Sequence, residues 1–228
     1  MSHYVKKYFN ELNKPEQMLI FLHGYNGCVD DIDKSLQYLT ARLPNTVIIA
    51  PEAETVSEKN PLKKQWYSLR AVDKDDKRRQ LDTPLSELVA IYNRYDLFLS
   101  KRADEVNLWI TQWQKEYGIS NKNTIIAGFS QGGMLACYTA LTRDNFDGKS
   151  LMFSAVVAGA DGLSKNQKSY PKTYLFHGDK DVSVNFKTMP FSVEWLSCHQ
   201  IKTKTFVYKD LAHAITEKEL DDAVRVIK

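Results

Sequence analysis

The chain has 228 residues, of which 43% are hydrophobic and 26% charged, and its formal net charge is +3. This composition is typical of a globular protein, and no linker or repeat divides the chain, so we expect one domain over residues 1–228. The small, scattered charge argues against a nucleic-acid partner. We expect neither a signal peptide nor a transmembrane segment, because no apolar run is suited to either role.

The first half of the chain alternates predicted strands with predicted helices. Residues 18–22 and 47–50 are continuous apolar runs, which are typical of strands buried on both faces. Between them, apolar residues recur at helical spacing until Pro44 ends the helix. The clearest helix is predicted over residues 96–117, with Gly118 in place for its C-terminal cap.

The second half continues this alternation. Strands are predicted at residues 123–127, 152–158, 174–177 and 205–208. Helices are predicted over residues 134–141, in the second half of residues 186–198, and after Thr216 and Glu219, which have capping-box spacing. Such alternation predicts an α/β fold, with a mostly parallel central sheet and helices on both faces.

The strongest functional signal is the G-x-S-x-G pattern of residues 128–132, which stands between a predicted strand and a predicted helix. In that setting a sharp turn exposes the hydroxyl of Ser130, and the flanking glycines allow neighbouring backbone to approach closely. The start of the following helix directs amide N–H groups at the same point, which favours a developing oxyanion. The pattern therefore predicts Ser130 as a nucleophile.

A serine hydroxyl needs a general base, and the base needs a group that orients it. Beyond Ser130 the chain supplies Asp179 and Asp181 after one predicted strand, and His213 after the last one. The carboxyl ends of parallel strands meet at one edge of a sheet, where α/β proteins bind their ligands. Serine, acid and histidine also follow in the chain order of α/β-hydrolases, although this order does not choose between the two aspartates.

The chain resembles the phospholipase/carboxylesterase family of α/β-hydrolases, which includes the acyl-protein thioesterases. The matching motifs occur in family order and span nearly the whole chain. They are Leu-His-Gly-Tyr-Asn-Gly at 22–27, Trp-Tyr at 66–67, Gly-Phe-Ser-Gln-Gly-Gly at 128–133, His-Gly-Asp-Lys-Asp at 177–181 and Ala-His at 212–213.

The resemblance implies the α/β-hydrolase fold and a role for each matching position. Ser130 would be the nucleophile, His213 the general base and Asp181 the orienting carboxylate, which leaves Asp179 to cap a turn. The backbone N–H groups of Tyr25 and Gln131 would form the oxyanion hole. Trp66 would lie beside the acyl pocket, and the alternative for this side chain is ordinary core packing.

Two segments depart from the family pattern. The family places prolines after its catalytic aspartate, whereas residues 182–185 read Val-Ser-Val-Asn. Residues 73–95 are longer and more charged than is usual there. This insertion is either a solvated excursion held by one apolar stripe or a flap over the pocket. Its basic run at 77–79 is matched by nearby aspartates, so we expect a solvated loop there.

The remaining histidines and cysteines are expected to be structural. His23 precedes the serine, which is the wrong order for a base, and His177 ends a strand beside the acidic loop. The three cysteines are widely spaced without a metal-binding pattern, which fits a reducing compartment and a cytoplasmic protein. Cys137 is expected in the core. We predict neither a metal nor another cofactor.

Together these features predict a serine hydrolase that cleaves carboxylic esters or thioesters through an acyl-enzyme intermediate. The substrate is a small acyl ester, a lysophospholipid or an acylated protein, and all three would use the same residues. The alternative is a catalytically weak relative that binds acyl groups, suggested by the altered loop after Asp181. The sequence leaves open whether the protein forms a homodimer.

Overall fold

The computed structural model describes residues 4–9 and 14–228. Part of the N-terminal stretch for which we expect no signal peptide lies outside the described residues. In chain order the elements are β1 (Val5–Tyr8), β2 (Gln17–Leu22), α1 (Val29–Arg42), β3 (Thr46–Pro51), β4 (Thr55–Val56), β5 (Lys64–Gln65), the 3-10 helix η1 (Lys77–Arg79), α2 (Leu85–Asn93), α3 (Asp96–Tyr117), the 3-10 helix η2 (Asn121–Asn123), β6 (Thr124–Phe129), α4 (Gln131–Thr142), β7 (Lys149–Phe153), α5 (Ala160–Asn166), β8 (Lys172–Gly178), α6 (Thr188–Cys198), β9 (Thr203–Tyr208) and α7 (Glu217–Ile227).

The described residues form a seven-stranded central sheet in the order β1-β3-β2-β6-β7-β8-β9. Strands β2, β3 and β6 to β9 pair in parallel, and β1 adds an antiparallel edge to β3. The buried strands are apolar on both faces, as expected for a sheet covered from both sides. The predicted α/β fold with a mostly parallel sheet is confirmed.

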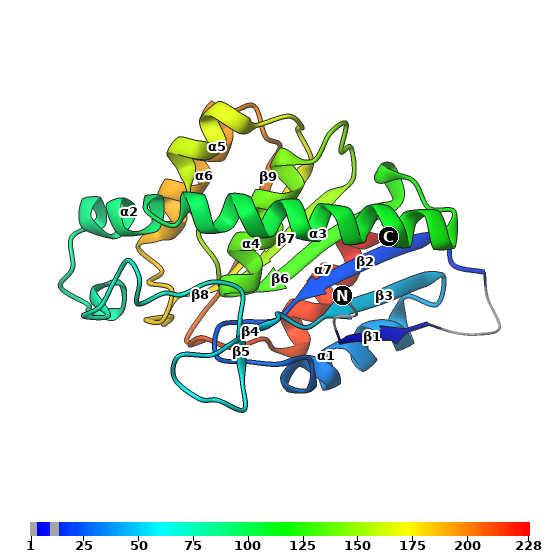
Figure 1. The fold of residues 1–228 in the computed structure, drawn as a ribbon, viewed down its shortest axis with the longest axis horizontal. Helices are drawn as coiled ribbons and strands as arrows, with labels where there is room; N and C mark the ends of the chain where they lie inside the picture. Colours follow the sequence, from blue (N-terminus) through cyan, green and yellow to red (C-terminus); the bar gives the residue numbers. More distant parts are fainter. Residues whose placement is uncertain (1–3, 10–13) are drawn as a thin grey trace.

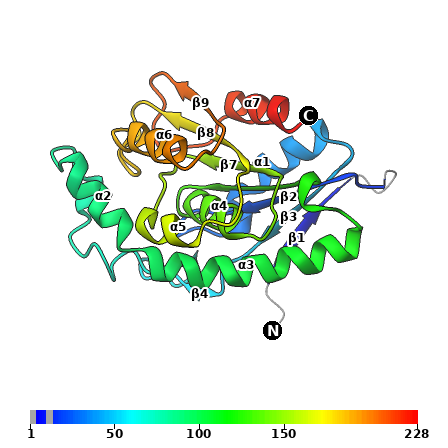
Figure 2. The ribbon, with the colours of Figure 1, turned by 90° about the horizontal axis from the view of Figure 1, so that it is seen from above.

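Helices cover both faces of this sheet (Figures 1 and 2). Successive residues of β2 point in opposite directions, so Leu19 and Phe21 pack with α1 and α7, whereas Ile20 and Leu22 pack with α3 and α4. The long helix α3 crosses the second face and ends at Gly118, whose φ of +68° is the left-handed cap conformation. No helix within residues 4–9 and 14–228 has the length and apolar character of a membrane span.

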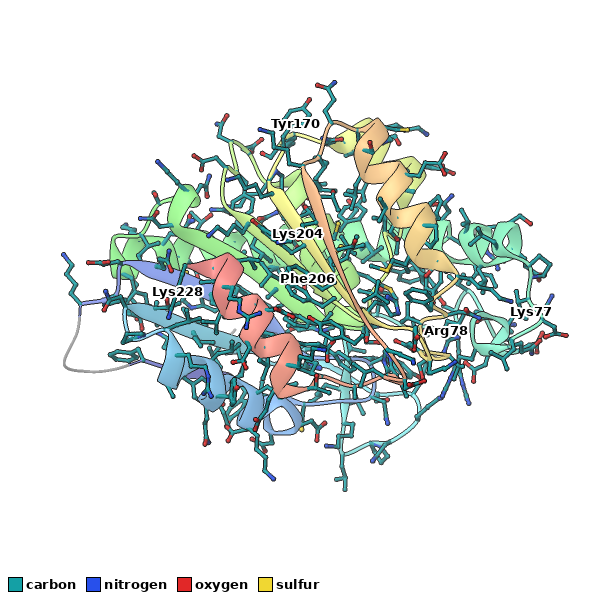
Figure 3. The ribbon with its side chains drawn as sticks, turned by 180° about the vertical axis from the view of Figure 1, so that it is seen from behind. Lys77, Arg78, Tyr170, Lys204, Phe206 and Lys228 are labelled. Atoms are coloured by element: carbon teal, nitrogen blue, oxygen red, sulfur yellow. The ribbon has the colours of Figure 1, made fainter. Side chains whose placement is uncertain are left out.

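Strand β9 forms the other edge of the sheet, and its Lys204, Thr205 and Val207 are exposed. Lys204 and Phe206 lie along it (Figure 3), with the Lys204 ammonium 5.0 Å from the centre of the Phe206 ring. A lysine on an edge strand opposes pairing with a further strand.

Most predicted elements are confirmed, including the capping box in which Thr216 and Glu219 begin α7. The strand predicted over residues 152–158 is wrong, because β7 runs from Lys149 to Phe153. Ser154 has a positive φ of 46°, and its N–H bonds the carbonyl of Phe176, so the chain leaves the strand there. The apolar residues 155–158 are a buried connection rather than a strand.

The insertion at residues 73–95 contains η1 and α2, neither of which the sequence predicted. Helix α2 buries Leu88, Ile91 and Tyr92 against the body, while Leu81 and Leu85 stay exposed. The prediction of one apolar stripe therefore fits α2. Whether the insertion moves as a flap stays a prediction.

The prediction of a solvated loop at residues 77–79 is wrong for its middle residue. Arg78 is only 4% exposed, and its guanidinium pairs with Asp73 at 2.8 Å and Asp76 at 2.7 Å. The nearby aspartates that suggested solvation instead allow this charge to be buried.

The fold brings four loops together at the carboxyl edge of the sheet. Tyr25 follows β2, Ser130 follows β6, Asp181 follows β8 and His213 follows β9. Since β2, β6, β8 and β9 are parallel members of one sheet, these distant residues share one rim.

Candidate active site

Ser130 sits at the sharp turn between β6 and α4. Its φ of 55° and ψ of −118° are strained for a residue with a side chain. The turn is held by hydrogen bonds from the Ser130 N–H to the Phe153 carbonyl (2.8 Å) and from the Met134 N–H to the Ser130 carbonyl (3.0 Å). The strand, the helix and the positive φ match the geometry expected for an exposed nucleophile.

The glycines around Ser130 are required by close backbone contacts. A Cβ on Gly128 would lie 2.3 Å from the Gly132 carbonyl oxygen, and a Cβ on Gly132 would lie 2.2 Å from the Leu22 carbonyl oxygen. No side chain fits at those distances. The start of α4 is thereby pressed against the end of β2, beside the loop that carries Tyr25.

Asp181 and His213 meet although 32 residues separate them. His213 Nδ1 lies 2.7 Å from Asp181 Oδ2, which is a short hydrogen bond between a ring N–H and a carboxylate. With its proton on Nδ1, the imidazole leaves Nε2 as the acceptor, and this is the tautomer that a general base requires.

The carboxylate of Asp181 is enclosed by further donors. Its Oδ1 accepts the backbone N–H groups of Ser183 (2.9 Å) and Val184 (3.0 Å), and its Oδ2 lies 3.2 Å from His177 Nε2. Burial alone would raise the pKa of Asp181, but the hydrogen bonds from His177 and His213 hold that pKa well below its ordinary value. Asp181 is therefore a carboxylate at neutral pH.

The loop after Asp181 is organised without the family's prolines. Because Ser183 and Val184 donate to Asp181 Oδ1, the aspartate itself sets the turn that follows it. The departure from the family pattern thus leaves Asp181 in contact with His213.

Ser130 and His213 line the same cavity, which has a volume of about 180 Å³. The ring of Phe129, the residue before Ser130, lies 4.6 Å from the ring of His213 and supports its orientation. The cavity is lined by Tyr25, Asn26, Lys59, Leu69, Arg78, Arg79, Tyr92, Ser130, Gln131, Met134, Ser183, Val184 and His213. We call it the Ser130 cavity.

Both residues expected to form the oxyanion hole lie at this cavity. Tyr25 comes from the loop after β2, and Gln131 is the first residue of α4, whose N-terminal amides are free of helical acceptors by position. The Tyr25 hydroxyl is fixed by a 3.0 Å hydrogen bond to Glu58.

Trp66 lies in the core and is absent from the described residues that line the Ser130 cavity. Its backbone N–H donates to Gln131 Oε1 (2.9 Å), and its indole N–H donates to the His23 carbonyl (2.8 Å). Gln131 Nε2 in turn donates to the Tyr67 carbonyl at 2.8 Å. The geometry favours the packing alternative for Trp66 and adds a role for the buried Gln131 amide, which joins the nucleophile turn to residues 66–67.

His23 holds the Tyr25 loop in place. The ring is fully buried; its Nε2 accepts the Ala53 N–H (3.1 Å) and its Nδ1 donates to the Gly24 carbonyl (2.8 Å). Burial lowers the pKa of His23 to about 4. This neutral histidine has a structural role, as expected from its place before the serine.

The two aspartates of residues 177–181 have different contacts. Asp179 Oδ1 accepts the Asp210 N–H at 2.7 Å, so Asp179 caps the turn that follows β9. Asp181 alone contacts the ring of His213.

Comparison with known sequences gives one family for nearly the whole chain. The model of the phospholipase/carboxylesterase family matches residues 9–228. The chain belongs to this family. The predicted family and the predicted class of enzyme, a serine hydrolase of the carboxylesterase type, are thereby confirmed.

Individual members of the family and solved structures agree with this assignment. Esterase YpfH of Escherichia coli is 19% identical over 213 residues, which cover 93% of this chain and 82% of that protein. Acyl-protein thioesterase 1 of Saccharomyces cerevisiae is 26% identical over 233 residues, which cover 96% of this chain and 94% of that protein. The crystal structure of esterase PE8 superposes with a TM-score of 0.80 at 22% identity over 99% of this chain and 97% of that chain, and so shows the same fold.

Sequence reasoning missed the charged part of the cavity wall. Lys59, Arg78 and Arg79 line the Ser130 cavity, although residues 77–79 were expected to be a solvated loop. The sequence signal available was that residues 73–95 are longer and more charged than is usual for the family. No family motif falls on Lys59, Arg78 or Arg79, so none of them could be named as a site residue.

The buried neutral His23 predicts a loss of stability in mild acid. The pKa of His23 is lower in the folded chain than in the unfolded chain, so its contribution is present above the unfolded pKa and is lost as the pH falls towards about 4. Between pH 7 and pH 5 this one group should reduce the free energy of unfolding by about 2 kcal/mol. Urea unfolding of the wild type and of His23→Gln at both pH values measures it. Equal pH dependence in the two proteins would contradict the prediction.

Exchanging each aspartate for asparagine separates the two acidic positions. Asp181→Asn removes the carboxylate that holds His213 in the required tautomer, so kcat should fall by about 10⁴-fold. Asp179→Asn keeps an oxygen for the Asp210 N–H, so kcat should stay within about threefold of wild type. Steady-state hydrolysis of an aryl ester measures both, and a larger loss in the Asp179 variant would reverse the assignment.

Proposed function

We propose that the protein hydrolyses carboxylic esters through a triad of Ser130, His213 and Asp181. The observation that carries the proposal is the 2.7 Å contact of His213 Nδ1 with the buried Asp181 carboxylate, on a ring that shares a cavity with Ser130. An imidazole oriented by a carboxylate, at the same cavity as a serine held on a strained turn, is the arrangement that activates a hydroxyl nucleophile.

In the proposed reaction the Ser130 hydroxyl oxygen attacks the ester carbonyl carbon while His213 Nε2 takes the hydroxyl proton. The N–H groups of Tyr25 and Gln131 hold the oxyanion of the tetrahedral intermediate. The imidazolium then gives its proton to the leaving alcohol or thiol, and an acyl-enzyme remains. Water enters, His213 takes a proton from it, and the water oxygen attacks the acyl carbonyl carbon. The bond between that carbon and the Ser130 oxygen then breaks, His213 returns the proton to Ser130, and the carboxylic acid leaves. The Asp181 carboxylate stabilises the imidazolium at both stages.

The size of the Ser130 cavity favours a short acyl group. Sites for drug-sized ligands usually enclose roughly 300–1,000 Å³, whereas this cavity has a volume of about 180 Å³. We therefore propose a short-chain carboxylesterase in preference to the two long-chain alternatives, a thioesterase acting on acylated proteins and a lysophospholipase. The three cysteines are all free, which supports the proposal that the enzyme works in the cytoplasm.

The alternative of a weakly catalytic acyl-binding protein depended on the altered loop after Asp181. In the structure that loop donates two N–H groups to the Asp181 carboxylate, so its changed sequence gives no reason for the acid to be misplaced. The enzyme remains the better proposal.

Covalent labelling tests the proposed nucleophile. A fluorophosphonate should label the folded wild-type protein, and Ser130→Ala should lose both the label and more than about 10³-fold of the ester hydrolysis. Ser154→Ala is a matched control at a buried serine after the next strand, and it should keep the label. An unlabelled wild type would favour the binding protein instead.

A panel of 4-nitrophenyl esters of increasing acyl length tests the proposed substrate size. We expect kcat/KM to be highest for acyl groups of about two to six carbons and to fall by at least about tenfold for twelve or more, because the longer chains exceed the enclosed volume. A steady rise of kcat/KM up to sixteen carbons would contradict the short-chain proposal and favour a lipid or lipidated substrate.

A further inference from the structure

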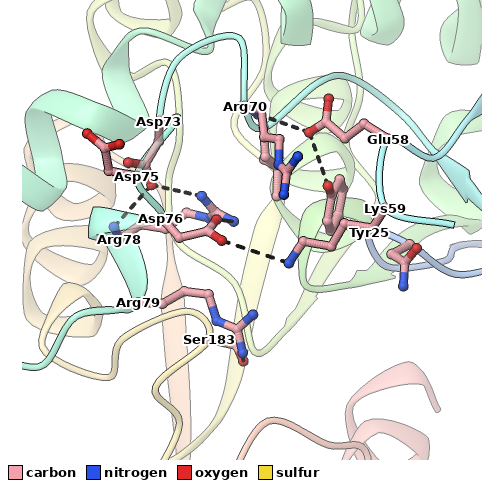
Figure 4. A network of polar contacts seen from close by, with 12 residues as sticks. Tyr25, Glu58, Lys59, Arg70, Asp73, Asp75, Asp76, Arg78, Arg79 and Ser183 are labelled. Carbon is pink, nitrogen blue, oxygen red and sulfur yellow. Dashed lines mark hydrogen bonds and ion pairs between the residues drawn. The ribbon is translucent and has the colours of Figure 1, made fainter.

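The Ser130 cavity carries positive charge on one wall. Lys59, Arg78 and Arg79 line it, and no carboxylate is found among the described residues of its lining. Lys59 approaches from one side of this polar network, and Arg78 and Arg79 approach from the other (Figure 4). An esterase that acts only on neutral acyl groups has no evident use for three cations beside its cavity.

The three cations are neutralised to different degrees. Arg78 is paired with both Asp73 and Asp76. The Lys59 ammonium lies 3.9 Å from the Asp76 carboxylate, which is beyond hydrogen-bond distance.

Arg79 is the least neutralised of the three. In the described part of the chain its guanidinium forms no ion pair, and its one polar contact is a long hydrogen bond of 3.4 Å to the Ser183 hydroxyl. Arg79 and Lys59 therefore present charge that an anionic ligand would satisfy.

Tyr92 gives a second, independent indication of a polar ligand. Its side chain lines the same cavity and is fully buried, yet its hydroxyl has no hydrogen-bond partner among the described residues. Burial raises the pKa of Tyr92, so the hydroxyl stays protonated and keeps a proton to donate. A buried hydrogen-bond donor without an acceptor is unfavourable unless a ligand in the cavity accepts the hydrogen bond.

The position of the cavity relative to His213 indicates which part of an ester enters it. His213 must give a proton to the leaving group, so the alcohol lies on the side of the imidazole. His213 also borders a separate depression, which Phe129, Ala214 and Ile215 line. Of the two, only the Ser130 cavity has Ser130 among its described lining residues, together with Leu69, Met134 and Arg79. Because the acyl group stays bonded to Ser130 after the alcohol leaves, this cavity is assigned to the acyl group.

We propose that the acyl group of the substrate carries a negative charge, as in a monoester of a short dicarboxylic acid. The methylene chain would contact Leu69 and Met134, and the free carboxylate would bind Arg79 and Lys59, with the Tyr92 hydroxyl as a further donor. This inference rests on the proposed esterase function and specifies its substrate class.

The test compares two esters that differ only in charge. The mono-4-nitrophenyl ester of adipic acid carries a free carboxylate, and the 4-nitrophenyl ester of adipamic acid carries a carboxamide of the same shape. We expect wild-type kcat/KM to be at least about tenfold higher for the carboxylate, because a charge-assisted contact is worth about that ratio or more. Equal values for the two esters would overturn the proposal.

Variants show whether the preference comes from the named residues. Arg79→Gln should reduce the ratio of the two kcat/KM values by about tenfold, and Tyr92→Phe, which removes only the hydroxyl, should also reduce it. Lys74→Gln removes an exposed cation of the same insertion that lines a different depression, and it should keep the wild-type ratio. A ratio unchanged by Arg79→Gln, or reduced equally by Lys74→Gln, would overturn the proposal.

Two further arms separate the inference from the function on which it rests. Hexanoate esters of 4-hydroxybenzoate and 4-hydroxybenzamide place the same charge difference on the alcohol. If the wild type prefers the 4-hydroxybenzoate ester by the same ratio, the enzyme attracts anions in general, and the acyl assignment is overturned.

Ser130→Ala is assayed with the carboxamide ester. If its hydrolysis persists, the proposed function fails; if it is lost while the wild type shows no preference for the carboxylate, only the inference fails.

Discussion

The buried carboxylate of Asp181 organises more of the candidate site than any other group. It receives the ring of His213, the ring of His177 and two N–H groups of its own loop, so four donors from two strand ends and a turn meet at one side chain. A carboxylate buried to this degree is tolerated only because these hydrogen bonds replace its water. The same contacts that stabilise the charge also orient the proposed base, and local stability and the proposed chemistry therefore depend on one group.

The proposed nucleophile is held by packing rather than by charge. Gly128 and Gly132 allow the start of α4 to press against the end of β2, and the positive φ of Ser130 persists because strand, helix and neighbouring backbone leave no alternative. The Gln131 side chain ties this turn to residues 66–67 through two hydrogen bonds. The proposed oxyanion donors and the proposed nucleophile are thus fixed by the same rigid frame, as preorganised catalysis requires.

Much of the fold and of the candidate site could be predicted because each rested on a local signal. Continuous apolar runs gave the central strands, and helical periodicity with Gly118 gave α3 with its observed bounds. A short motif and chain order pointed to Ser130 and His213. The extent of β7 was mispredicted because residues 155–158 are apolar for burial in a loop, and hydrophobicity alone does not distinguish a buried loop from a strand.

What the sequence did not give depends on contacts between distant segments. The burial of Arg78 follows from two ion pairs that only the folded insertion creates, and a run of charges reads as solvated without them. Chain order left Asp179 and Asp181 open and only the family motif favoured Asp181; the contact that distinguishes them, from Asp181 to the ring of His213, depends on the fold. The core position of Trp66 was one of two alternatives that the motif left open.

The insertion and the loop after Asp181 touch each other at two points. Arg79 donates to the Ser183 hydroxyl, and the Lys187 ammonium donates to the Leu81 carbonyl. Residues 73–95 therefore adjoin the turn that carries the proposed catalytic acid. For directed evolution, this means that swapping the insertion for that of a homologue also alters the supports of Asp181, so chimaeras should exchange both segments as one unit.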